Sequence, residues 1–264
     1  MPRYKLTIEY AGTRYSGWQI QQNARTVQGE LVRALATVAG ARGEVYGAGR
    51  TDAGVHALAQ VAHADLRDAL PPATLVGRLN EALPADINVL TAERVPARFH
   101  ARHSATARSY LYQISRRRTA FAKPFVWWVR EDLDVAAMQA AARHFIGLSD
   151  FRSFTDDDPE EKSTRVRLHR VDIAAHGALI LLRVVGSHFL WKMVRRLTGV
   201  LAGVGRSDLA PDAAAALIAA DSPLPARLTA PASGLFLERV FYDEPPDAWP
   251  LVPAIPCRAG DSDR

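Results

Sequence analysis

Hydrophobic residues in the first hundred positions alternate in some stretches and recur every three to four positions in others. Residues 3–10 alternate, which predicts a strand with one buried face. Thr26 and Gly40 bracket a run at helical spacing and predict the start and end of a helix. The remaining patterns predict two short strands, a second helix stopped by Pro84 and a further strand, over residues 44–49, 58–66, 74–83 and 86–95. This order, β-α-β-β-α-β, is that of the split βαβ arrangement.

A similar order of patterns recurs in the second half. Tyr110, Tyr112 and Ile114 share one face of an alternating strand over residues 106–115. Later elements are expected as strands over residues 125–130, 166–175, 179–185 and 235–242, and as helices over residues 135–146, 189–204 and 211–220. We therefore expect an α+β protein of two ferredoxin-like, RRM-like halves, with mostly antiparallel sheets joined across a central active-site cleft.

The chain is expected to divide into three parts. Residues 1–103 form an N-terminal half that carries an unusual acidic loop, and residues 104–243 form a C-terminal half. Residues 244–264 are rich in proline and poor in large apolar side chains, which predicts a flexible tail. The acidic stretch from Thr155 to Glu161 is a second candidate for mobility.

Composition indicates an ordinary soluble globular protein. The 264 residues are 48% hydrophobic and 23% charged, and no apolar run is long enough to predict a membrane span. The N-terminus lacks the apolar segment of a signal peptide. Cys257 is the only cysteine, which excludes an internal disulfide and a multi-cysteine metal site. We expect a cytoplasmic protein.

Basic residues are concentrated in two blocks. Residues 94–130 hold nine Arg or Lys and no acid, and residues 162–206 hold nine more against the single acid Asp172. A net charge of +5 arranged in this way favours a nucleic-acid partner, because phosphates bind clustered cations. The alternative is that solvated strand faces happen to be rich in arginine.

The loop Gly47–Ala57 is the most unusual segment. Three glycines surround Arg50, Thr51 and Asp52 between two predicted strands, which suits a stiff loop that presents one carboxylate. The alternative is an Asx turn, in which Asp52 bonds its own backbone. The loop lacks the sequence of a P-loop or a dinucleotide fingerprint, and His56 and His63 have no metal-ligand spacing, so no metal site is expected.

The segment Gly49–His56, Gly-Arg-Thr-Asp-Ala-Gly-Val-His, resembles the signature of the tRNA pseudouridine synthase A family. Four further segments resemble that family in the same order, from residue 4 to residue 242. These segments are Tyr15–Gln19 with Val27-Gln28, Phe99–Arg102 with Ser104–Tyr110, His188–Arg195 and Ser233–Leu237. The sequence departs from the family at Trp191-Lys192, at Arg196 and in the acidic stretch from Asp156 to Arg167, which affects the details of RNA contact.

The resemblance implies an isomerase that converts uridine to pseudouridine at positions 38 to 40 of the tRNA anticodon arm, without a cofactor. It implies a homodimer with tRNA lying across both subunits. Asp52 would be the catalytic carboxylate, as nucleophile or as base, and Arg195 would be its positive partner. The other implied site residues are Tyr110 against the uracil, Arg50 on the RNA backbone and Leu235 in the pocket wall.

Other functional classes stay open at this point. The basic blocks and the topology would also suit a non-catalytic tRNA-binding protein. That alternative predicts exposed aromatics in the style of RNP motifs, and only Tyr110 and Tyr112 are placed that way. A metal-dependent nuclease is disfavoured by the lack of clustered carboxylates.

Overall fold

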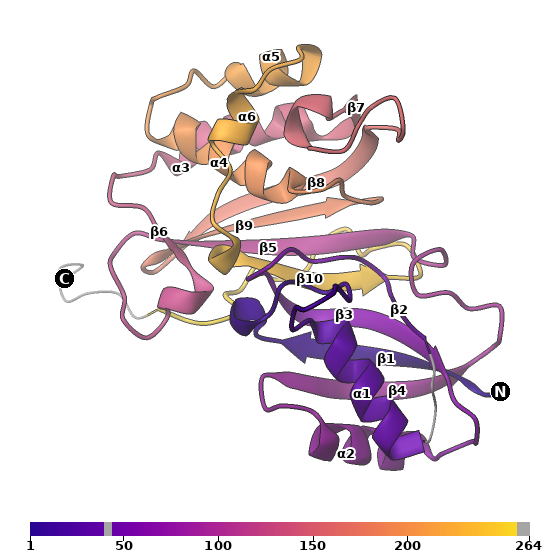
Figure 1. The fold of residues 1–264 in the computed structure, drawn as a ribbon. Coiled ribbons are helices and arrows are strands. Elements are labelled where there is room, and N and C mark those ends of the chain that lie inside the picture. Colours follow the sequence, from indigo (N-terminus) through magenta and orange to yellow (C-terminus); the bar gives the residue numbers. More distant parts are fainter. Residues whose placement is uncertain (40–43, 258–264) are drawn as a thin grey trace. The chain divides into compact units, whose positions relative to one another are not determined.

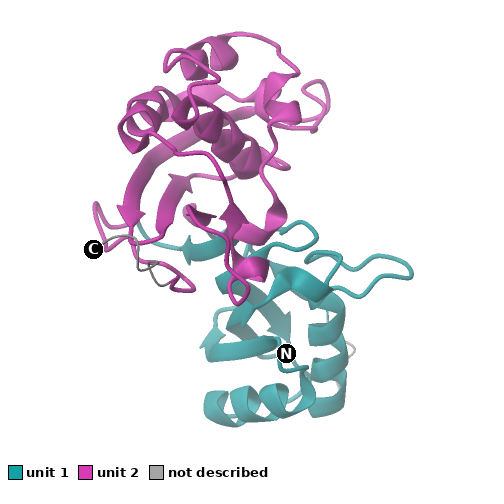
Figure 2. Ribbon diagram, turned by 90° about the vertical axis from the view of Figure 1, so that its left-hand side faces the viewer, with its two compact units in different colours: residues 1–106, 236–244 teal, residues 107–235, 245–264 magenta. Residues whose placement is uncertain are grey.

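The computed structural model describes residues 1–39 and 44–257, in two compact units (Figure 2). Unit 1 contains Met1–Thr106 and Phe236–Glu244, and unit 2 contains Ala107–Leu235 and the tail that starts at Pro245. The first border lies three residues beyond the expected one at residue 103. The last strand is grouped with unit 1, because the chain returns to the first sheet near its end.

Unit 1 is built on strands β1 (Arg3–Tyr10), β2 (Val45–Gly47), β3 (His56–Asp65), β4 (Ile87–Val95) and β10 (Leu235–Phe241). The order is β4-β1-β3, with β2 antiparallel to β3. This is the 4-1-3-2 order of a ferredoxin-like sheet. β10 joins it by pairing with β3 in parallel, with Phe236 opposite His56. Alternate residues of β1 are buried, as its pattern predicts.

Helices α1 (Val27–Ala39) and α2 (Pro72–Ala82) complete unit 1, after the short 3-10 helix η1 (Gly12–Arg14) (Figure 1). α1 buries Val27, Leu31 and Leu35, and α2 buries Leu75 and Leu79. α2 begins two residues earlier than predicted, because Pro72 is well suited to the first helical turn. The predicted end of α1 at Gly40 lies outside the described residues.

The sheet of unit 2 has the order β5-β9-β8-β7, and all three pairings are antiparallel. Its strands are β5 (Ala107–Ser115), β7 (Gly147–Asp150), β8 (Arg165–His176) and β9 (Leu179–Gly186). The short β6 (Trp127–Trp128) pairs with β5 in parallel. It is shorter than the strand predicted over residues 125–130, because the 3-10 helix η2 (Lys123–Phe125) precedes it. β7 was not predicted, because its four residues are too few to show a clear alternation of apolar and polar side chains.

The described part of unit 2 also contains the helices α3 (Val135–Ala142), α4 (Met193–Gly205), α5 (Ala213–Ala219) and α6 (Leu224–Arg227), together with the 3-10 helices η3 (Arg143–Phe145), η4 (Arg152–Phe154) and η5 (Ala232–Gly234). α4 begins at Met193 rather than at Phe189, because Lys192 has the left-handed φ of 61°. Nearly all of α4 is buried. Gly199 allows its close approach to Leu228, where a Cβ would lie 1.7 Å from the carbonyl oxygen.

The tail was expected to be flexible, and its described part, residues 245–257, makes specific contacts with unit 2. Arg183, which is fully buried on β9, donates to the carbonyls of Trp249 and Pro250 at 3.0 and 2.9 Å. The amide oxygen of Gln113 accepts a bond from Ala254 N at 2.7 Å. The segment satisfies buried polar side chains of the sheet, which is why its backbone has a defined path.

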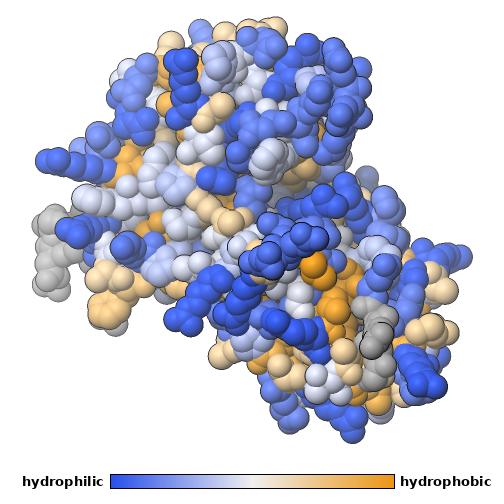
Figure 3. All heavy atoms as spheres, in the orientation of Figure 1, coloured by the Kyte–Doolittle hydropathy of each residue, from blue (hydrophilic) through white to orange (hydrophobic). Residues whose placement is uncertain are grey.

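The expected class, α+β with mostly antiparallel sheets, is confirmed. Hydrophobic side chains are buried in both units, and the face shown in Figure 3 is largely hydrophilic. Within the described ranges, no helix is both long enough and apolar enough to cross a membrane.

Candidate active site

Asp52 lies half-buried in the loop that joins β2 to β3. The loop turns at Asp52–Val55, where Val55 N donates to the carbonyl of Asp52 at 3.1 Å. Gly54 has a φ of 79° at the third position of this turn, a conformation that favours glycine. The backbone of the aspartate is thus part of a tight turn, with Arg50 exposed two residues earlier.

Hydrogen bonds from buried groups fix both sides of Asp52. Thr51, 6% exposed, shares a 2.8 Å bond with the hydroxyl of Tyr10, and its carbonyl accepts from Trp18 N at 3.0 Å. Burial raises the pKa of Tyr10 to about 12, so its hydroxyl stays protonated at neutral pH. Earlier in the loop, the carbonyl of Gly49 accepts a bond from the side chain of Gln60 on β3 at 3.0 Å. The carboxylate therefore sits on a rigid support.

The segment Gly12–Trp18 packs directly against this loop. A Cβ on Gly12 would lie 1.9 Å from the carbonyl oxygen of Val55, so that position has no room for a side chain. Gly17 has a φ of 91°, and its Cβ would lie 2.6 Å from the carbonyl of Thr51. The sequence showed that the 15–19 stretch resembles a family motif. In the structure this stretch packs against the backbone of the Asp52 loop.

The two histidines near Asp52 in sequence are packed inside unit 1. His56 is 1% exposed, stacks on Phe236 with 4.8 Å between ring centroids, and accepts from Gly12 N at 3.0 Å through Nδ1. His63 is 2% exposed and accepts from Ala101 N at 3.1 Å. His56 thereby ties η1 to the end of the Asp52 loop. Sequence reasoning gave it no such role, although its position right after the glycine-rich segment was a signal.

Tyr110 lies on β5 in unit 2, 8% exposed and opposite Val184 on β9. Its ring meets the ring of Phe189 edge-on, with centroids 4.9 Å apart. The neighbouring Tyr112 is fully buried and donates to the carbonyl of Pro231 at 2.7 Å. Of the two tyrosines on this face, Tyr110 is the less enclosed.

Arg195 lies in the first turn of α4 and is tied to the segment before β10. Its Nε donates to the carbonyl of Ala230 at 2.8 Å, while Ala230 N donates to the carbonyl of Arg195 at 3.1 Å. Tyr112 on β5 donates to the carbonyl of the next residue, Pro231. The strand β5 and the helix α4 therefore both hold this segment. Leu235, 5% exposed, follows at the start of β10. The guanidinium of Arg195 therefore has a fixed position.

The predicted site residues divide between the units. Arg50 and Asp52 share one loop of unit 1, and Tyr110, Arg195 and Leu235 belong to unit 2. Sequence reasoning missed the residues that support them, above all Tyr10, Gly12 and His56. Their contacts join segments that are far apart in the sequence, so no local pattern reveals them.

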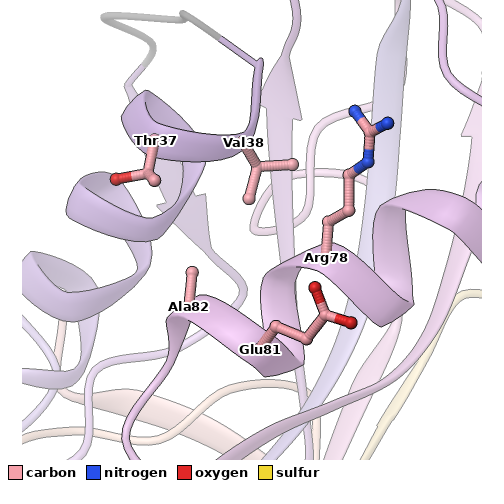
Figure 4. A pocket seen from close by; sticks show the side chains of 5 residues that line it. All are labelled: Thr37, Val38, Arg78, Glu81 and Ala82. Carbon is pink, nitrogen blue, oxygen red and sulfur yellow. The ribbon is translucent and has the colours of Figure 1, made fainter.

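A shallow pocket of about 430 Å³ lies elsewhere in unit 1, between α1 and α2 (Figure 4). None of the predicted site residues lines it; Thr37, Val38, Arg78, Glu81 and Ala82 do. Among the residues that the structure describes, no three His, Cys, Asp or Glu side chains are grouped so that they could hold a metal ion.

The departures noted at Trp191-Lys192, Arg196 and the acidic stretch contact one another. Arg196, 3% exposed on α4, forms an ion pair with Asp156, which also bonds Lys192 at 2.7 Å. The backbone N–H of Trp191 donates to Asp157 at 3.2 Å. The acidic stretch and the basic start of α4 thus compensate each other's charge.

Comparison with known proteins identifies the family. The model of the tRNA pseudouridine synthase family matches residues 6–104 and 141–243. The protein named tRNA pseudouridine synthase A of Rhodopseudomonas palustris strain BisA53 is 46% identical over 92% of this chain and all of its own length. The proteins of that name from Nitrobacter hamburgensis and Geotalea uraniireducens are 43% and 41% identical, over 92% of this chain and all of their own length.

A solved archaeal box H/ACA complex of Nop10 and Cbf5 aligns with 75% of this chain and 43% of that chain. Its TM-score is 0.35 at 11% identity. The sequence matches are decisive by themselves.

The family model and these relatives place the α+β chain in the class of RNA-modifying isomerases. The chain belongs to the tRNA pseudouridine synthase family, and its activity is the isomerisation of uridine in tRNA to pseudouridine. The resemblance drawn from the sequence is thereby confirmed, and the non-catalytic alternative is set aside.

Proposed function

We propose that this enzyme modifies uridines 38 to 40 in the anticodon stem-loop of tRNA and that the Asp52 carboxylate is its essential catalytic group. The observation that carries this proposal is the rigid support of Asp52. Thr51 and Val55 on either side of it are buried, and hydrogen bonds from Tyr10, Trp18 and Gln60 hold the loop. A catalytic group needs such fixed geometry.

The reaction breaks the bond between N1 and C1′, turns the uracil, and joins C5 to C1′. C5 gives up its proton and N1 gains one, so substrate and product are isomers and no cofactor is required. The base must leave the stack before a side chain can reach it, at a cost of a few kcal/mol. The ionised Asp52 then serves as nucleophile, which divides the rearrangement into easier steps.

The residues of unit 2 would complete the site. Arg195 would keep Asp52 ionised in a pocket from which the base excludes water, since a nearby cation offsets desolvation. Its bonds to Ala230 support this role, because they fix the guanidinium. Tyr110 would stack on the uracil and Leu235 would form an apolar wall, while the exposed Arg50 would bind the RNA backbone.

The remaining proposals concern partners and location. The enzyme would act as a cytoplasmic homodimer with tRNA across both subunits. The basic blocks support recognition of the tRNA through its phosphates, which serves an enzyme that modifies several neighbouring uridines.

The test is Asp52→Asn, which keeps the size of the side chain and removes its charge. With tRNA tritiated at uridine C5, product formation releases tritium to water. We expect the rate to fall at least about a thousandfold, because the essential group is lost, while the affinity for tRNA stays within about threefold.

Asp68→Asn, the same change at an exposed position of unit 1, is the control and should leave the rate unchanged. Tritium release by Asp52→Asn at the wild-type rate would refute the role of Asp52. Mapping pseudouridine in the product tRNA tests positions 38 to 40.

A further inference from the structure

The loop between β5 and η2 presents an aromatic ring to solvent. Phe121 is 98% exposed, more than any other large hydrophobic residue in the described part of the chain. Burying a phenylalanine typically stabilises a fold by about 1.5–3 kcal/mol, and Phe121 contributes none of this. The ring therefore has no role in the folding of unit 2.

The loop is held in place although its tip is exposed. Arg116 N donates to the carbonyl of Ala178 at 2.9 Å, and the hydroxyl of Ser115 donates to the carbonyl of Arg117 at 2.6 Å. On the other side Ala122 is 4% exposed, and its N–H donates to the hydroxyl of Thr119 at 3.3 Å. The start of the loop and the residue that follows Phe121 are thus anchored, and the ring is exposed between them.

Cations surround the ring in sequence. Arg116, Arg118 and Lys123 are exposed, and no ion pair of theirs occurs among the described residues. No acidic residue occurs between Arg94 and Arg130. Trp128 on β6 adds a second aromatic, 44% exposed, while Trp127 faces inward against Tyr112.

An exposed aromatic among cations has the chemistry that binds unpaired nucleotides. Bases stack on aromatic side chains, and cations bind the phosphates on either side. A second copy of the same loop is a less suitable partner, because the cations of the two loops would repel one another. An apolar protein surface would leave the arginines without partners.

We propose that residues 116–123, the Phe121 loop, bind tRNA directly: Phe121 stacks on an unpaired base while Arg116, Arg118 and Lys123 bind neighbouring phosphates. This inference rests on tRNA as the substrate and adds a contact surface outside the residues assigned to the chemistry.

The test is Phe121→Ala, measured by the dissociation constant for unmodified tRNA at fixed salt. Loss of one stacked base should weaken binding about 5- to 150-fold, since such stacking contributes about 1–3 kcal/mol. Phe121→Trp should bind within about twofold of wild type. Val252→Ala, which shortens another exposed apolar side chain of unit 2, should not change the affinity.

The cations are tested together by Arg116→Gln, Arg118→Gln and Lys123→Gln in one chain. Removing three phosphate contacts should reduce the slope of log affinity against log salt by about 2. The tritium-release rate of Phe121→Ala at saturating tRNA should equal that of wild type. This separates the proposal from the role of Asp52, whose loss affects the rate and not the affinity.

Wild-type tRNA affinity in Phe121→Ala would overturn the proposal. If that variant bound tRNA normally but changed its sedimentation from dimer to monomer, the Phe121 loop would be a subunit contact instead.

Discussion

Individual histidines support the Asp52 loop and its sheet by accepting hydrogen bonds from backbone N–H groups. His63 is the clearest case. It stacks on Tyr46 with ring centroids 5.1 Å apart, and its ring lies 4.6 Å from that of His100. Burial, together with the charges of Arg3 and His100, lowers the pKa of His63 to about 4. The ring is neutral at pH 7, as its role as an acceptor for Ala101 N requires.

This pKa makes a prediction about acid stability. In the unfolded chain His63 has a pKa near 6.5, whereas in the folded protein it binds a proton only near pH 4. Stability from this group is therefore lost as the pH falls from about 6.5 to 4. His63→Asn keeps an acceptor but does not titrate. Between pH 7 and pH 5 the wild type should lose about 1–2 kcal/mol more free energy of unfolding than this variant, in urea titrations.

His103→Asn, at an exposed position, is the control and should follow the wild type. Equal losses in wild type and His63→Asn would show that His63 titrates normally.

The acidic stretch from Thr155 to Glu161 and helix α4 are held together by ion pairs. Arg196 is almost fully buried, and its ion pair with Asp156 is joined by Lys192. The bond from Lys192, and then that from Arg196, hold the pKa of Asp156 below its usual range. Arg195, the proposed positive partner of Asp52, is the residue before Arg196. The ion pair of Arg196 with Asp156 therefore also helps to fix the backbone at Arg195.

Asp156→Asn should therefore destabilise the protein. The substitution leaves the buried Arg196 without its anionic partner, and we expect a loss of about 1–3 kcal/mol in urea unfolding at pH 7, reduced by the exposure of Asp156. The matched control is Glu161→Gln, which removes one charge from the same stretch at an exposed position.

In a double-mutant cycle, Asp156→Asn and Arg196→Met should be non-additive, because each removes the same ion pair. Additive losses would contradict a direct coupling.

At the scale of the whole molecule, the end of the chain contributes to both units. After β10 completes the sheet of unit 1, the tail covers the face of the unit 2 sheet that carries Gln113 and Arg183. The Trp249 ring lies 4.4 Å from the guanidinium carbon of Arg183 and 4.9 Å from that of Arg170. A buried arginine on β9 thus finds two of its hydrogen-bond acceptors in residues far along the chain.

Trp249→Ala should consequently lower the free energy of unfolding by about 2–4 kcal/mol, from lost burial and two cation–π contacts. Trp249→Phe keeps an aromatic face and should lose less than half as much. Urea unfolding followed by circular dichroism measures both variants. An unchanged stability of Trp249→Ala would mean that the tail adds nothing to the fold.

The sequence by itself determined the α+β class, the order of the long strands and helices, and the segment that carries the candidate carboxylate. Strands such as residues 3–10 and 107–115 are predictable because alternation is a local property of the chain. The glycine-rich segment around Asp52 is equally local, and so is its resemblance to the family.

Only the tertiary structure decided what supports these residues. Tyr10 bonds Thr51, His56 bonds Gly12, and Arg195 bonds Ala230, each across a long stretch of sequence. The defined path of residues 245–257 and the late start of α4 at Met193 also depend on such contacts. Local patterns record which face of an element is buried; they do not record which distant backbone groups will meet it.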